Sequence, residues 1–261
     1  MTVPVAMIPY TNMAPYRELG PPAGCHFVPM VPTESVEALM TRSVAAAAVP
    51  VGALPRLEGR VESVGRFGIA ARGACMSVLF FSRVPFESMH APHCLRITAE
   101  SASSVRLLFL LLGRTLGYDR LPRLVRDGQT PDAELNIGDR ALIKGMADRN
   151  ADEWSYVTDL SQKWFEIHGL PFVFARWVVG TDVALTVKNA LARWLDEFKA
   201  REAELVARAV PRAACALNVT PELIERYFGV IRRCLGEGDI QGQRRFLREI
   251  EQAGKQPLFE S

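Results

Sequence analysis

The sequence has 261 residues, of which 49% are hydrophobic and 23% are charged, and these fractions are ordinary for a globular protein. Its formal net charge of +2 argues against a nucleic-acid-binding surface, because such surfaces carry a concentrated basic excess. The five cysteines are odd in number and form no CxxC pair, which argues against a disulfide framework and against a thiolate zinc site.

The N-terminal sequence MTVPVAMIPY has no basic segment followed by an apolar one, so it is not typical of a signal peptide. The longest strongly apolar run covers residues 107–112, and a bilayer-spanning helix needs about 20 residues. We therefore expect a cytoplasmic protein with no membrane partner and no nucleic-acid partner.

Short apolar runs alternate with helical patterns along the first part of the chain, which predicts an α/β fold. Four of these runs are predicted to be strands, namely residues 3–9, 45–49, 77–82 and 95–98. The first strand ends in a polar turn that contains Asn12. Thr33 is expected to cap a helix that lies between the first two strands.

A serine cluster made of Ser101, Ser103 and Ser104 precedes apolar residues at helical spacing, so it is predicted to lie at a helix N-terminus. One of these serines is expected to cap that helix. Further along, a short strand is predicted to turn into a helix at Asp139.

Residues 170–179 (LPFVFARWVV) are predicted to form a long strand. From Asp182 onward the apolar residues follow helical spacing to the end of the chain. Thr220 followed by Pro221 predicts a helix start, and a last helix is expected after Asp239. The final third of the chain is therefore predicted to be helical.

Six segments form an ordered series of motifs. They are YTNMAP at residues 10–15, SVLFFSR at 77–83, SASSV at 101–105, IGDRAL at 137–142, DL with a later Trp at 159–164, and GLPFVFARW at 169–177. In this order and spacing, they resemble the chorismate dehydratase family of the futalosine route to menaquinone. They also resemble its sister family, the 1,4-dihydroxy-6-naphthoate synthases.

The resemblance implies a two-lobed α/β fold of the periplasmic-binding-protein type (type II), with two crossover strands and a helical C-terminal third. The crossover strands would be residues 77–83 and 170–179. Lobe one would comprise residues 1–85 and 175–261, lobe two would comprise residues 86–174, and the ligand cleft would lie between the lobes.

The chain carries Gly138-Asp139 where the sister cyclase carries a His-Glu pair. A histidine suits proton abstraction from a complex substrate, so its absence favours the dehydratase. The chain also departs from the dehydratase pattern. Ala14 replaces a common basic residue, Ala45 replaces an aspartate, and Thr98-Ala99-Glu100 replaces Asp-Pro-Ser. These departures leave the identity of the substrate open.

The activity implied by the resemblance is loss of water from the dianion chorismate, which yields 3-[(1-carboxyvinyl)oxy]benzoate. Asn12 is the expected catalytic residue. The expected substrate-binding residues are Ser77, Ser101, Ser103, Ser104 and Asp139. No cofactor is expected, and no metal is expected because the four histidines do not follow metal-ligand spacing.

Several alternatives remain open. Asn12 could satisfy its own turn, the serines could act only as caps, and Asp139 could cap its helix. No motif residue is an obvious general base, so the enolpyruvyl carboxylate of the substrate is one candidate. The competing functions are a 1,4-dihydroxy-6-naphthoate synthase-type cyclase and a cytoplasmic small-anion binding or sensor protein, and a homodimer is left open.

Overall fold

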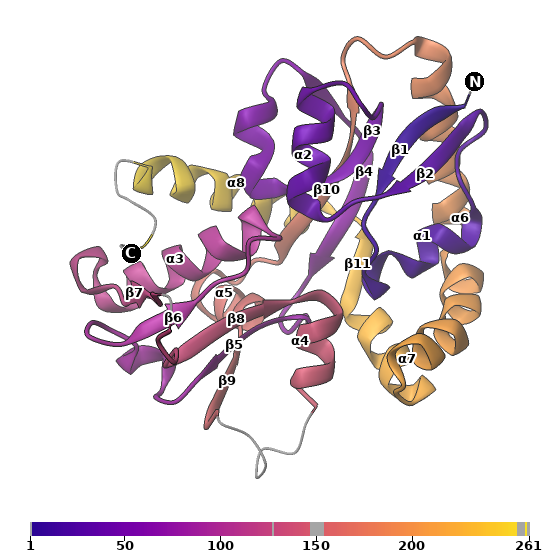
Figure 1. The fold of residues 1–261 in the computed structure, drawn as a ribbon. Helices are drawn as coiled ribbons and strands as arrows, with labels where there is room; N and C mark the ends of the chain where they lie inside the picture. Colours follow the sequence, from indigo (N-terminus) through magenta and orange to yellow (C-terminus); the bar gives the residue numbers. More distant parts are fainter. Residues whose placement is uncertain (1, 127, 147–153, 255–258, 260–261) are drawn as a thin grey trace. The chain divides into compact units, whose positions relative to one another are not determined.

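The computed structural model describes residues 2–126, 128–146, 154–254 and 259, and its chain divides into two compact units (Figure 1). The first unit comprises Met1–Ala70 and Val173–Glu237. The second comprises Ala71–Phe172 and Gly238–Ser261. The chain therefore passes from one unit to the other three times.

The first unit is built on a six-stranded sheet with the strand order β11-β4-β10-β3-β1-β2. The bounds of these strands are β1 Val3–Met7, β2 Cys25–Pro29, β3 Ala46–Pro50, β4 Val61–Ala71, β10 Phe172–Gly180 and β11 Ile231–Cys234. Strand β1 is parallel to both β2 and β3, whereas β10 is antiparallel to β3. All five residues of β3 are buried, as the uninterrupted apolar run of its sequence predicts.

The helices of this unit are α1 Ala14–Leu19, α2 Pro32–Met40, α6 Leu185–Leu217 and α7 Pro221–Val230, with 3-10 turns η1 Thr11–Met13 and η2 Val51–Leu57. Helix α1 packs against α6 through Tyr16, whose ring is stacked on that of Phe198 with the centroids 4.0 Å apart. Trp177 and Trp194 complete this aromatic core. The core places α1, and the η1 turn just before it, against the long helix.

The second unit is built on a five-stranded sheet with the order β7-β6-β8-β5-β9. The bounds are β5 Val78–Ser82, β6 Cys94–Arg96, β7 Arg123–Leu124, β8 Ala133–Ile137 and β9 Tyr156–Asp159. Its helices are α3 Ala102–Leu116, α4 Gly138–Lys144, α5 Leu160–His168 and α8 Glu237–Ala253, with 3-10 turns η3 Phe86–Ser88 and η4 Tyr118–Arg120. Gly242 lets α8 pack closely, because an added Cβ there would lie 2.0 Å from the carbonyl oxygen of Pro171.

One predicted crossover strand was wrong. Residues 77–83 do not leave the first unit, because β5 lies inside the second sheet between β8 and β9. The chain leaves the first unit at the end of β4, which the apolar pattern did not predict. Strand β4 contains glycines that weaken a strand pattern, and Gly68 is needed there because a Cβ would lie 2.1 Å from the carbonyl oxygen of Ala175.

The structure also differs from the predicted lobes in two stretches. Residues 71–85 and 238–261, which were expected in lobe one, group with the second unit. The predicted ligand cleft between the lobes stays a prediction. Strand β11 interrupts the final third, which was predicted to be helical throughout.

Of the three predicted helix caps, at Thr33, in the serine cluster and at Thr220, two are confirmed. Ser101 caps α3 by accepting from the Ser104 N–H at 3.2 Å, and Thr220 caps α7. Thr33 does not cap α2. That helix begins after Val31, whose N–H donates to the Glu34 carboxylate at 3.1 Å.

Candidate active site

One edge of the second sheet gathers most of the predicted substrate-binding residues. Strand β8 is parallel to β6, and both β8 and β9 are antiparallel to β5, so the carboxyl ends of β6, β8 and β9 meet the start of β5 at this edge. The Gly138 N–H donates to the Ser77 carbonyl oxygen at 2.8 Å, which joins the start of α4 to the start of β5. Ligands of open α/β sheets bind outside such carboxyl ends.

The serine cluster lies at the N-terminus of α3, next to this edge. The Ser101 hydroxyl oxygen accepts from the Ser104 N–H and lies 3.1 Å from the Ser104 hydroxyl. Ser103 and Ser104 are buried. The capping interpretation is therefore confirmed for Ser101, while substrate contact by the three serines stays a prediction.

Ser77 and Asp139 are held differently. The Ser77 hydroxyl donates to the Cys75 carbonyl oxygen at 3.4 Å, and Ser77 is 3% exposed. Asp139 lies half-buried in the first turn of α4 and is not its cap, because that position belongs to Ile137. A carboxylate in a first turn is stabilised by the helix dipole.

Asp159 fixes the loop that leads into Ser77, and its role was not predicted. Its Oδ2 accepts from the N–H groups of Cys75 and Met76 at 2.9 and 2.8 Å, while its Oδ1 caps α5 by accepting from Ser161 and Gln162. Burial raises the pKa of the Asp159 carboxyl, and the donated hydrogen bonds offset part of that rise. An aspartate directly before a helical pattern was the signal for the cap.

Asn12 belongs to the first unit and lies in η1, shortly after the carboxyl end of β1. Its Oδ1 is buried, and within the part of the chain that the structure describes it has no hydrogen-bond partner. The turn interpretation, in which this oxygen would accept from its own backbone, is therefore wrong. An unpaired buried acceptor is costly and calls for an explanation.

Arg233 is a buried cation beside Asn12 that sequence reasoning missed. Its Nε–H donates to the Asn12 carbonyl oxygen at 3.3 Å, and its side chain is 1% exposed. Its Nη1 donates to the carbonyl oxygens of Phe228 and Ile231 and lies 3.6 Å from Glu202 Oε1. Burial lowers the pKa of this guanidinium from its ordinary value, although arginine stays charged in proteins. No sequence signal marked it, because arginines are rarely buried.

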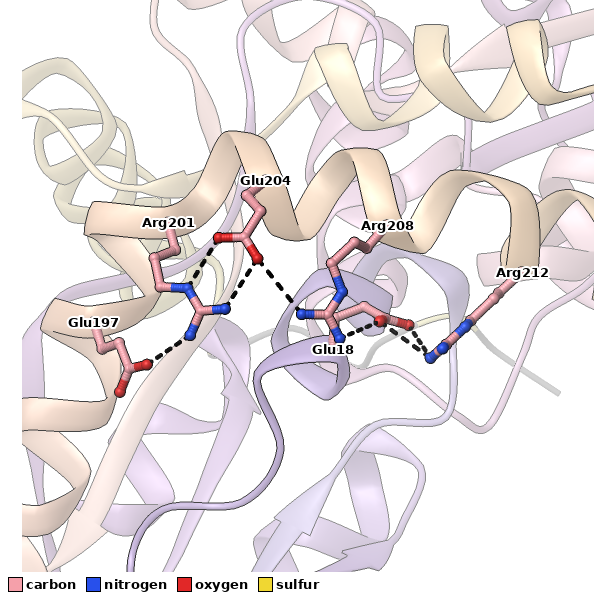
Figure 2. A network of polar contacts seen from close by, with 6 residues as sticks. All are labelled: Glu18, Glu197, Arg201, Glu204, Arg208 and Arg212. Atoms are coloured by element: carbon pink, nitrogen blue, oxygen red, sulfur yellow. Dashed lines mark hydrogen bonds and ion pairs between the residues drawn. The ribbon is translucent and has the colours of Figure 1, made fainter.

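The segment around Asn12 is also anchored from α1. Arg17 Nη1 donates to the carbonyl oxygens of Ile8 and Tyr10 at 2.9 and 3.1 Å. The next residue, Glu18, accepts from Arg212 at 2.9 Å and lies 3.4 Å from Arg208, both on α6 (Figure 2). The Glu18 contacts hold the last turn of α1 on α6, and the Arg17 contacts tie the same turn to the backbone just before η1.

The described residues offer neither a metal-ligand cluster nor a membrane-spanning helix. Over residues 2–126, 128–146, 154–254 and 259, no group of three or more His, Cys, Asp or Glu side chains could hold a metal ion. None of the helices in the described ranges is long and apolar enough to cross a membrane.

Comparison with known proteins assigns the chain to a family. A family model described as menaquinone biosynthesis matches residues 3–252. The chorismate dehydratase of Thermus thermophilus is 29% identical over 260 residues, with 92% of each chain covered.

Solved structures support the fold. Protein AF1704 from Archaeoglobus fulgidus superposes with a TM-score of 0.72 at 13% identity, with 98% of both chains covered. The Candida albicans CA3427 product, described as having the generic periplasmic binding protein fold, gives 0.62 at 13% identity, with 98% of this chain and 91% of that chain covered. At such identities the likeness shows the fold alone, which is the periplasmic-binding-protein-like α/β fold. The family match extends over nearly the whole chain, and the protein therefore belongs to the menaquinone biosynthesis family.

Proposed function

We propose that the protein is a chorismate dehydratase, a lyase that removes water from chorismate to give 3-[(1-carboxyvinyl)oxy]benzoate. Membership of the family and the Thermus thermophilus relative support this proposal. The observation that carries it is the buried, unpartnered Oδ1 of Asn12, described above. Leaving such an acceptor unpaired costs about 1–3 kcal/mol, and a hydroxyl of a bound substrate would remove that cost.

The reaction breaks the C4–O bond and the C3–H bond of chorismate, and the ring becomes aromatic. Aromatisation supplies the driving force, so the enzyme must chiefly orient the substrate and place charge. Asn12 is the proposed catalytic residue, because its amide can bond the leaving hydroxyl without itself ionising. The C3 proton would pass to the enolpyruvyl carboxylate of the substrate and from there to the departing hydroxyl, which leaves as water, while the electron pair of the C3–H bond forms the new ring double bond.

The two carboxylates of the substrate need donors. We assign this role to Ser77, Ser101, Ser103 and Ser104, together with the N–H groups at the start of α3, and we place Asp139 among the substrate-binding residues in another role. A helix N-terminus favours an anion through its free N–H groups and its dipole. Asp139 is itself an anion and would repel a carboxylate unless protonated or shielded, so its contact would be with a hydroxyl.

The first prediction concerns turnover. Purified protein incubated with chorismate should form a product lighter by one water, detected by mass spectrometry. Asn12→Ala should lower turnover at least roughly tenfold, since roughly 1.4 kcal/mol of transition-state stabilisation corresponds to that factor. Asn189→Ala, at an exposed position of α6, is the matched control and should leave turnover unchanged.

Three other outcomes would contradict the proposed dehydratase activity. Unchanged chorismate with the wild-type protein would refute the dehydratase. Binding of chorismate without turnover would indicate a small-anion binding protein of the same fold. Conversion of the sister family's substrate instead of chorismate would indicate the cyclase.

A further inference from the structure

The Arg233 guanidinium is poorly compensated for a buried charge. Among the described residues its Nη2 has no hydrogen-bond partner. Among the same residues its ion-pair partner is Glu202, which lies 3.6 Å away and is 30% exposed. Its other contacts with the described part of the chain include backbone carbonyl oxygens and the ring of Phe228, whose centroid is 5.2 Å from the guanidinium carbon.

Stability alone does not explain such a residue. Taking a charge out of water costs several kcal/mol, and well-packed hydrophobic replacements of buried ion pairs are often neutral or stabilising. Incompletely satisfied buried groups in native structures therefore call for another explanation, which is often functional. The surroundings of Arg233 point to one.

Arg233 is tied to the Asn12 segment in two ways. Its Nε–H donates to the Asn12 carbonyl oxygen at 3.3 Å. Its own carbonyl oxygen lies 3.3 Å from the hydroxyl of Tyr16, the first aromatic residue of α1. Arg17 holds the two carbonyl oxygens before the turn, at Ile8 and Tyr10. Within these contacts, Arg233 is the side chain that holds Asn12 itself.

The Asn12 amide is not aimed by a bond of its own Oδ1, which has no partner among the described residues. Its direction therefore depends on the backbone of η1, and so on the contacts that hold that backbone. We propose that Arg233 is a positioning residue, which fixes the Asn12 carbonyl and thereby aims the Asn12 amide at the substrate. This inference rests on the proposed function, in which Asn12 is catalytic.

The test is a double-mutant cycle between Arg233→Met and Asn12→Ala, with kcat and KM for chorismate and the melting temperature measured on the same samples. Loss of positioning should lower kcat roughly tenfold and change KM less than about threefold. When Asn12 is already alanine, Arg233→Met should lower kcat less than about twofold, because the effects of two coupled residues are not additive. Arg232 is the exposed neighbour of Arg233 in β11, and Arg232→Met is the matched control. It should leave kcat and KM unchanged.

The kinetic outcomes separate the roles. Equal losses of kcat in both backgrounds would make Arg233 an independent structural residue, and a raised KM with unchanged kcat would assign it to attraction of the anion. Either result overturns the inference, as does the absence of any loss. If Arg233→Met does not fold, Arg233→Lys keeps the charge but not the planar donor set, and the same cycle applies.

A second readout does not depend on the reaction. The side-chain amide resonances of Asn12, observed by NMR without substrate, should shift or split in Arg233→Met, while those of Asn189 stay unchanged. An unchanged Asn12 amide would refute positioning even if chorismate is the substrate. A shifted Asn12 amide in a protein that leaves chorismate intact would uphold positioning and refute the proposed function.

Discussion

Glu134 is a buried carboxylate on β8 whose charge is well compensated. It accepts from Asn136 Nδ2 at 2.6 Å and from Lys144 Nζ, and Arg96 lies 3.9 Å away. Burial raises the pKa of this carboxyl, but Lys144 and Asn136 together lower it more, so the pKa falls below its ordinary value. A carboxyl with a lowered folded-state pKa stabilises the fold only while it is ionised.

Glu134→Gln should therefore be less stable than the wild type by about 1–3 kcal/mol at pH 7. The contribution is fully present above the pKa of the unfolded chain, about 4.3, and is lost as the pH falls through the lower folded-state value. Urea unfolding at pH 7 and pH 3 should show the difference shrinking in acid. Glu87→Gln is the control, because its pair with Lys163 is half-exposed and contributes below about 1 kcal/mol. Equal losses in the two variants at pH 7 would contradict this account.

The candidate site residues that the sequence predicts lie in short linear motifs, whereas residues defined by distant partners gave no sequence signal. Asn12, Ser77 and Ser101 each lie in such a motif, and the cap formed by Ser101 depends only on Ser104, three residues away. Arg233 contacts Asn12 although the two residues are 221 positions apart in the sequence. No local pattern reports such a contact.

At the level of elements, long apolar patterns predicted their structures correctly, whereas the sequence did not predict strands β4 and β11. In β4 the alternation is interrupted by glycines, of which Gly68 is required by the packing against β10, and β11 has only four residues. Edge and crossover strands of this kind are defined by their neighbours in the sheet. The first crossover could therefore not be located from the sequence.

Helix α1 is short, so its position depends on tertiary contacts rather than on its own propensity. Figure 2 shows Glu18 of α1 facing Arg208 and Arg212 of α6. Glu18→Gln should destabilise the protein by about 1–2 kcal/mol, since Glu18 is 7% exposed while both arginines can be hydrated. Urea unfolding measures the loss, and hydrogen exchange should show faster opening of the α1 amides.

The control for this substitution lies in the same network. Glu197→Gln removes an exposed partner of Arg201, which keeps its second partner Glu204, and should cost less than about 0.5 kcal/mol. If Glu197→Gln were as harmful as Glu18→Gln, the anchoring of α1 would not be the reason.

At the scale of the whole molecule, the reaction is expected to need no metal. This expectation comes from the sequence, in which the four histidines do not follow metal-ligand spacing. Dialysis against EDTA should therefore leave chorismate turnover within about twofold of the untreated rate. A large loss that zinc or magnesium restores would contradict this expectation.

The fold class was predictable because the motifs carry it in their order, but the boundaries of the units were not. The last helix shows why. Its apolar face at Phe246 predicted burial without saying against what, and in the structure Phe246 packs on Trp164 and Phe172 of the second unit. A periodic pattern thus specifies a buried face, whereas its partner depends on long-range packing.

The three passages of the chain between the units have a consequence for synthesis. As the chain emerges from the ribosome, the first sheet lacks an edge strand until β11 has appeared, and the second unit lacks α8 for longer still. The second unit therefore cannot finish folding when its sheet is made, and must wait until the first unit is complete and α8 has followed. Until β11 has appeared the nascent chain carries two unfinished cores, a state in which exposed apolar surface invites chaperones.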